Sequence, residues 1–123
     1  MYEKIGLGTA QWGMDYGVNN TLGKTNFQDI SKILKKASEM RINTIDTAFL
    51  YGESESTIGK FNLDNYLIVT KTNKFEATSI SDFEVNLLEQ DFFKSLNNLN
   101  LNNIYGLLIH RGKDLLKENS YKL

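Results

Sequence analysis

The amino-acid sequence predicts an α/β fold in which helices cover a parallel sheet. Three observations lead to this prediction. Four short runs are apolar at successive positions, as in strands that are buried on both faces. Stretches with apolar residues at helical spacing lie between these runs, and the connections between them are short and polar. Strands that alternate with helices in this way form a parallel sheet, and the 123 residues show no internal boundary, so one domain is expected over 1–123.

Four strands are predicted, and three of them end on an ionisable side chain. The first contains Gly6 and Gly8, which either let a ligand or a neighbouring chain approach the backbone or make a bend at the strand end. The second ends at Asp46, the third at Lys71, and His110 closes the fourth. The predicted strand ranges are 5–9, 42–46, 67–71 and 104–109.

Three helices are predicted between the strands, and the start of a fourth follows the last strand. Each of the three begins near a side chain that can cap a helix N-terminus. The first and third carry clear apolar stripes, which predict faces that pack against the core. The candidate caps are Thr25 or Asn26, then Ser54, then Ser79 or Ser81. The predicted ranges are 26–40, 54–61 and 81–99, with 114–119 opening the fourth.

Composition argues against several classes of function. The formal net charge of −1 argues against a broad basic surface for nucleic acid or for an anionic membrane. The absence of cysteine excludes a disulfide framework and a thiolate metal site, and no other metal site is predicted. No apolar run has the length of a membrane-spanning helix, and no signal peptide opens the chain. We therefore expect a soluble cytoplasmic protein.

Asp46, Lys71 and His110 are predicted to meet at one rim of the sheet, because chemistry in parallel α/β folds lies at the carboxyl ends of the strands. Tyr51 follows the second strand and can reach the same rim. Taken singly, Asp46 could cap a turn, Tyr51 could be a packing aromatic, and the lone histidine could be structural. A lysine that closes an apolar strand needs a partner or a route to water. The joint placement favours a chemical role.

These four side chains suit the reduction of a carbonyl group. A lysine ammonium beside a phenol favours loss of the phenolic proton, and a carboxylate beside the lysine would hold and orient it. A histidine can fix the direction of a substrate carbonyl through a hydrogen bond. Such a set protonates the carbonyl oxygen while a hydride reaches the carbon. None of the four supplies the hydride, so a nicotinamide cofactor is implied.

With these residues in place, the sequence resembles the aldo-keto reductase family. The resemblance covers nearly the whole chain, and the order Asp, Tyr, Lys, His in these local contexts is its most specific part. The matching segments are 6–13, 46–48 with Tyr51 and Gly52, Ser54 with Glu55, Ile58 with Gly59, 69–71 and 108–111.

The resemblance implies a role for each candidate residue. Tyr51 would be the general acid, Lys71 and Asp46 would adjust its acidity, and His110 would orient the substrate. Trp12 would line the substrate pocket, although a lone tryptophan in a loop is more often a packing anchor. Segment 8–17 is similar to family members found with bacterial surface-sugar pathways, which points to a sugar-like carbonyl substrate. The positions that match the nicotinamide end of an NADPH site are Gly8, Thr9, Ala10 and Asp46.

The family fold, by the same resemblance, is an eight-stranded TIM-type barrel of about 250 residues or more. This chain would supply half of it: four strands with three to four helices. The other half carries most contacts to the cofactor's pyrophosphate, adenine and 2′-phosphate, so NADPH binding by this chain alone should be weak or absent. A non-catalytic half-barrel that binds or assembles, and a truncated product without function, are the alternatives. Two open sheet edges predict a homodimer or a missing carboxyl-terminal half.

Overall fold

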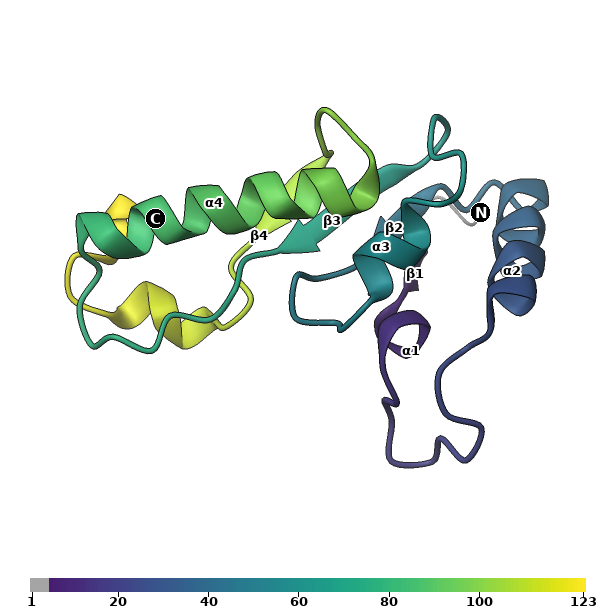
Figure 1. Cartoon of the computed structure of the whole chain (residues 1–123), viewed down its shortest axis with the longest axis horizontal. Coiled ribbons are helices and arrows are strands. Elements are labelled where there is room, and N and C mark those ends of the chain that lie inside the picture. Colours follow the sequence, from purple (N-terminus) through teal and green to yellow (C-terminus); the bar gives the residue numbers. More distant parts are fainter. Residues whose placement is uncertain (1–4) are drawn as a thin grey trace.

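The computed structural model describes residues 5–123, and its centre is a parallel sheet of four strands. Neighbouring strands are parallel throughout, and they lie in the sheet in chain order (Figure 1). This confirms the predicted α/β architecture. The strands are β1 (Gly6–Gly8), β2 (Thr44–Asp46), β3 (Leu67–Lys71) and β4 (Gly106–Leu108). The helices are α1 (Ala10–Gly13), α2 (Phe27–Glu39), α3 (Ser54–Ile58) and α4 (Asp82–Leu99), followed by two 3-10 helices, η1 (Gly112–Leu116) and η2 (Ser120–Lys122).

Two of the predicted helix caps are confirmed and one is wrong. The Asn26 side chain accepts a hydrogen bond from the Asp29 N–H at 2.9 Å, and Ser81 forms a reciprocal capping box with Glu84. Ser54 does not cap α3. Glu53 occupies the cap position without a side-chain hydrogen bond, and Ser54 lies inside the first turn, because its hydroxyl bonds to Thr9 in the protein interior.

The predicted helix at residues 114–119 is also wrong. Two short 3-10 helices take its place, because Lys117 has extended backbone angles and Asn119 has a positive φ of 58°. Extension at this point lets Glu118 form a parallel bridge with Ser79 in the loop before α4. Its carbonyl accepts a hydrogen bond from the Ile80 N–H at 2.8 Å. The chain end is therefore tied to that loop instead of continuing as a helix.

The two faces of the sheet differ in what covers them. Ile45 and Ile68 are paired across β2 and β3, and both are buried beneath the helices. Since successive side chains of a strand alternate between faces, Leu67 points the other way, as does Leu108 on β4, and the latter is 49% exposed. The core comprises Trp12, Ile30, Leu34, Ile45, Ile58, Leu63, Ile68 and Leu99, drawn from β2, β3, all four helices and the loop before β3.

The side of the sheet away from the helices, which we call the open face, is lined by small residues at both edges. A Cβ added to Gly6 would touch the Thr44 side chain, and one added to Gly106 would touch the Val69 side chain. The glycines therefore lie on the same face as these residues. The open face consists of Gly6, Gly8, Thr44, Asp46, Leu67, Val69, Lys71, Gly106 and Leu108, and the helices α1 to α4 contribute to the core on the opposite face.

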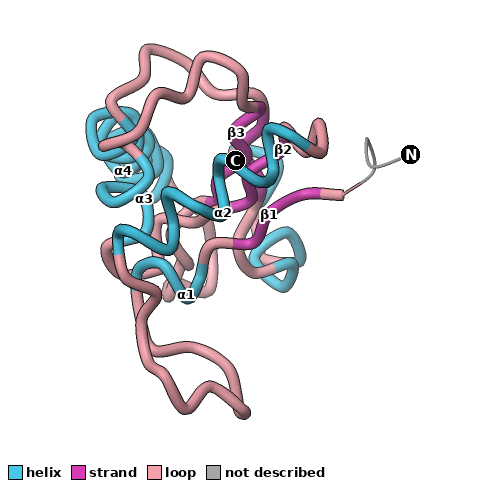
Figure 2. Tube along the Cα trace, turned by 90° about the vertical axis from the view of Figure 1, so that its right-hand side faces the viewer, coloured by secondary structure: helices cyan, strands magenta, loops and turns pink. Residues whose placement is uncertain are grey.

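The segment that joins α1 to α2 extends away from the sheet in both views (Figure 1, Figure 2). The Asn20 amide braces it by donating hydrogen bonds to the carbonyls of Tyr16 and Gly23, at 3.0 Å and 2.9 Å. Within residues 5–123, no helix has the length and apolar character needed to cross a bilayer.

Candidate active site

Lys71 and Asp46 form the centre of the candidate site at the carboxyl ends of β2 and β3. The Lys71 ammonium donates hydrogen bonds to both Asp46 carboxylate oxygens, at 2.8 Å and 2.7 Å, and to the Thr47 carbonyl, at 2.8 Å. All three of its protons are thereby used. The lysine side chain is 16% exposed and the Asp46 side chain 42%, so the pair sits at the surface of the open face with the lysine underneath.

Tyr51 and His110 lie against this pair. The Lys71 Nζ is 5.0 Å from the centroid of the Tyr51 ring. The ring centroids of Tyr51 and His110 are 6.0 Å apart, with their planes at 75°, so the two rings meet edge to face. The structure thus brings together the four side chains that the sequence singled out. Their catalytic roles stay predictions.

Two glycines fix the loop that carries Tyr51. Gly13, at the end of α1, packs so closely that an added Cβ would lie 1.9 Å from the Tyr51 carbonyl oxygen and 2.2 Å from the Ser54 nitrogen. Gly52 adopts a φ of +57°, and an added Cβ there would lie 2.5 Å from the Gly13 carbonyl oxygen. The Glu53 N–H donates to that same carbonyl at 3.2 Å. Close packing between the backbone at Gly13 and the backbone of residues 51–54 therefore fixes the position of the loop that carries the Tyr51 phenol.

Three buried hydroxyl groups support Asp46 from below, and the contacts among them were not predicted from the sequence. Thr9 donates its hydroxyl proton to the Asp46 carbonyl at 3.0 Å. The Ser54 hydroxyl lies 2.8 Å from the Thr9 hydroxyl and 3.2 Å from the Thr47 hydroxyl. This cluster joins the residues that follow β1 and β2 to the start of α3, directly behind the site. Ser54 looks like an ordinary helix cap in sequence, because the partners that draw it inward are distant along the chain.

The surroundings of His110 favour its neutral form. Its backbone N–H donates to the Thr72 hydroxyl oxygen at 3.2 Å. Burial lowers the pKa of its imidazole, and the positive charge of Lys71 lowers it further. Within the described residues Nδ1 is buried without a hydrogen-bond partner. A buried N–H without an acceptor is costly, so this placement favours the tautomer with the proton on Nε2. The ring is then a hydrogen-bond donor through Nε2.

The residues predicted to lie near a nicotinamide border an open pocket beside Tyr51. Gly8, Thr9, Ala10 and Asp46 line it together with the Tyr51 ring. A Cβ added to Gly8 would meet nothing within 4 Å, so the strand offers a flat backbone surface there. Thr9 itself is fully buried and its hydroxyl is already bonded within the protein, which leaves Gly8, Ala10 and Asp46 as the accessible part.

Trp12 does not lie in this pocket. It is 4% exposed and packs in the core. This is the packing position that the sequence also allowed, and a substrate contact by Trp12 stays a prediction. Across residues 5–123, no three His, Cys, Asp or Glu side chains are grouped so that they could hold a metal ion.

Comparison with known proteins decides the family. The sequence model of the aldo/keto reductase family matches residues 4–117, which is nearly the whole chain. The chain belongs to the aldo/keto reductase family. A search of curated proteins gave no match.

Two solved structures from Pseudomonas aeruginosa, both assigned as aldo-keto reductases, resemble this member of the family. One superposes with a TM-score of 0.75 at 29% identity and the other with 0.72 at 28% identity. Each match covers 93% of this chain but only 46% or 45% of the other. The chain thus spans less than half the length of these relatives, and its four strands correspond to part of a TIM-type barrel.

Proposed function

We propose that this chain provides the catalytic half of an NAD(P)H-dependent carbonyl reductase. The observation that carries the proposal is the contact group around Lys71, whose ammonium is bonded to the Asp46 carboxylate and lies 5.0 Å from the Tyr51 ring. A phenol, an ammonium and a carboxylate in this order suit general acid catalysis toward a carbonyl oxygen. Membership in the aldo/keto reductase family supports an oxidoreductase.

Each side chain has one task in this proposal. Tyr51 donates its proton to the carbonyl oxygen as negative charge develops there. Lys71 favours the phenolate that remains, because its positive charge is close to the ring, and Asp46 keeps the ammonium in place. His110, neutral and protonated on Nε2, donates a hydrogen bond that sets the direction of the carbonyl. A bound nicotinamide cofactor supplies the hydride.

The residues present fit only one end of such a cofactor. Gly8 and Ala10 offer a backbone surface next to Asp46 and Tyr51, which suits a flat nicotinamide ring. The two relatives extend well beyond the part that this chain matches. We therefore expect weak NADPH binding, or none, from this chain alone. A sugar-like carbonyl compound is the substrate class that we propose, on the resemblance of segment 8–17 alone.

A further part of the proposal is that the chain works in a larger assembly. The open face leaves Leu67 and Leu108 exposed, and the edge strands β1 and β4 each have one side without a neighbouring strand in the described sheet. A second copy of the chain or another half-barrel would cover both. A non-catalytic binding module is the second candidate function, and the same uncovered face favours it.

Replacing Tyr51 by phenylalanine tests the catalytic proposal. Tyr51→Phe keeps the ring and removes the acidic proton, so carbonyl reduction by the active assembly should fall by about 10²–10⁴-fold. Tyr121→Phe is the matched control, because Tyr121 is 83% exposed and takes no part in the contacts around Lys71. Turnover by Tyr51→Phe within a few-fold of the parent protein would remove Tyr51 as the general acid.

A further inference from the structure

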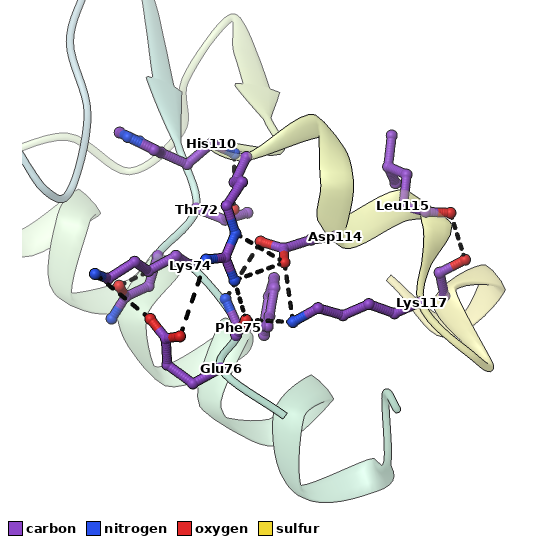
Figure 3. Close-up of polar contacts among 11 residues, drawn as sticks. Thr72, Lys74, Phe75, Glu76, His110, Asp114, Leu115 and Lys117 are labelled. Carbon is purple, nitrogen blue, oxygen red and sulfur yellow. Dashed lines mark hydrogen bonds and ion pairs between the residues drawn. The ribbon is translucent and has the colours of Figure 1, made fainter. Parts of the chain in front are cut away.

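A fully buried carboxylate lies outside the four site residues, in the segment that follows β4. One Asp114 carboxylate oxygen accepts hydrogen bonds from Arg111, at 3.2 Å from Nε and 3.0 Å from the terminal nitrogen. The same oxygen lies 3.0 Å from the Lys117 ammonium. The other oxygen accepts the Phe75 backbone N–H at 3.3 Å. Figure 3 shows these groups converging between the loop after β3 and the segment after β4.

Asp114 is ionised despite its burial. Burial by itself would raise the pKa of this carboxyl group, but hydrogen bonds from Arg111 and Lys117 lower it below the ordinary value. The two cations also donate to the Phe75 carbonyl oxygen, so that residue is held through both its N–H and its C=O. We call Asp114, Arg111, Lys117 and Phe75 the Asp114 clamp.

The clamp joins the loop that leaves β3 to the loop that leaves β4. The two loops are also bonded at their origins, where the Thr72 N–H donates to the Leu108 carbonyl at 2.9 Å. Next along the chain, the His110 N–H donates to the Thr72 hydroxyl at 3.2 Å. His110 therefore lies between two sets of hydrogen bonds, those at the ends of β3 and β4 on one side and those of the Asp114 clamp on the other (Figure 3).

We propose that Asp114 is a positioning residue for His110. Arg111 directly follows His110 in the chain. Its guanidinium is held by two hydrogen bonds to the Asp114 carboxylate, so the backbone at His110 has little freedom to rotate. Through Arg111 and Phe75, Asp114 keeps the imidazole edge-on to Tyr51, 6.0 Å from centroid to centroid. The catalytic meaning of this role rests on the proposed function of His110, whereas the positional claim stands on the contacts alone.

The alternative is that the clamp only fastens the end of the chain. It would then contribute stability without affecting the imidazole, as an ion pair in any buried loop could. The two roles differ in what happens at His110 while the protein remains folded. Because His110 is the only histidine, its ring protons are identified in an NMR spectrum without further assignment.

The test is Asp114→Asn in the full chain, studied at a temperature where circular dichroism shows native helix content. The amide keeps the size of the side chain but cannot hold two cations. We expect the cross-peaks between the His110 and Tyr51 rings to disappear. The His110 amide should exchange with solvent about tenfold faster or more, because a segment that loses charge-assisted hydrogen bonds opens locally. Amides of the core strands, such as Ile45, should keep their protection.

Two further variants make the result decisive. Arg111→Gln removes the grip on His110 but leaves Lys117 beside the carboxylate, so it provides the same readout if Asp114→Asn does not fold. Asp82→Asn is the control, since Asp82 pairs with Lys122 at 2.8 Å and its side chain is 90% exposed. Unchanged ring cross-peaks and exchange in a folded clamp variant would overturn the proposal, and so would an equal loss in Asp82→Asn. None of these readouts requires cofactor or turnover, so a failure of the proposed reductase activity remains separate.

Discussion

Replacing Lys71 by methionine should destabilise the fold by an amount that the structure lets us estimate. The ammonium makes three hydrogen bonds, two to Asp46 and one to the Thr47 carbonyl. Hydrogen bonds to charged groups contribute about 1.5–3 kcal/mol, and because 42% of the Asp46 side chain is exposed, water screens this pair and the lower end applies. Loss of the bond to the buried Thr47 carbonyl adds about 1 kcal/mol, for a total of about 2–3 kcal/mol.

Urea unfolding of four proteins measures this effect and assigns it to the pair. The proteins are the parent, Lys71→Met, Asp46→Asn and the double variant. Trp12 is the only tryptophan and is buried in the core, so its fluorescence follows global unfolding. Residues in direct contact show coupling energies of about 0.5–3 kcal/mol, and we expect about 1–2 kcal/mol here.

A coupling energy indistinguishable from zero would refute the reasoning. It would mean that Lys71 and Asp46 act independently on the free energy of unfolding, so the ammonium would not be held by the carboxylate. The catalytic proposal would then lose the positional argument that links Lys71 to Tyr51. A destabilisation by Lys71→Met with no coupling would instead assign the whole effect to the Thr47 carbonyl and to packing.

Three further predictions concern other parts of the molecule. Gly13→Ala should lower the free energy of unfolding by about 1–3 kcal/mol or more, because its Cβ would meet the Tyr51 and Ser54 backbone. Gly112→Ala is the control and should be neutral, because a Cβ there meets nothing within 4 Å. Equal urea midpoints for the two variants would contradict this prediction. His110 has a lowered pKa in the fold, so its contribution to stability should be complete above about pH 6.5 and be lost as the pH falls through the folded-state value. Urea midpoints between pH 7.5 and 5 should show this slope, and His110→Gln should abolish it. Light scattering during size exclusion should give a mass above the 14.1 kDa of one chain, and a well-folded monomer would show that the open face needs no cover.

The arrangement of the site could be predicted from sequence because it follows from strand direction alone. Parallel strands bring their carboxyl ends to one edge, so Asp46 and Lys71 had to lie close once both strands were recognised. The prediction did not require knowledge of any side-chain contact. Tyr51 followed because only a short loop separates it from β2.

What could not be predicted depends on partners that are far apart in sequence. Ser54 looks like a helix cap until Thr9, 45 positions away, accepts its hydroxyl. Glu55 looks like a surface acid at a helix start, yet it is buried and accepts the Thr70 hydroxyl at 2.6 Å. Asp114 looks like the start of a longer helix, and nothing near it in sequence indicates that Phe75, 39 positions earlier, donates its N–H to the carboxylate. Local propensity contains no information about such partners.

The glycines of the open face restrict what can close this half-barrel. Barrel interiors are filled by layers of side chains, and a space as large as a methyl group costs about 1 kcal/mol when left empty. At Gly6 and Gly106 this chain contributes no side chain to those layers, whereas the surface at Gly8 is the one proposed for the nicotinamide ring. A polypeptide that packs on the open face would therefore need large residues such as leucine, methionine or phenylalanine opposite these glycines to fill the interior. In a symmetric pair of identical chains, glycines would face glycines wherever the symmetry aligns these edges, and the interior would be left underfilled. An asymmetric pairing, in which large side chains face these glycines, fills the interior better.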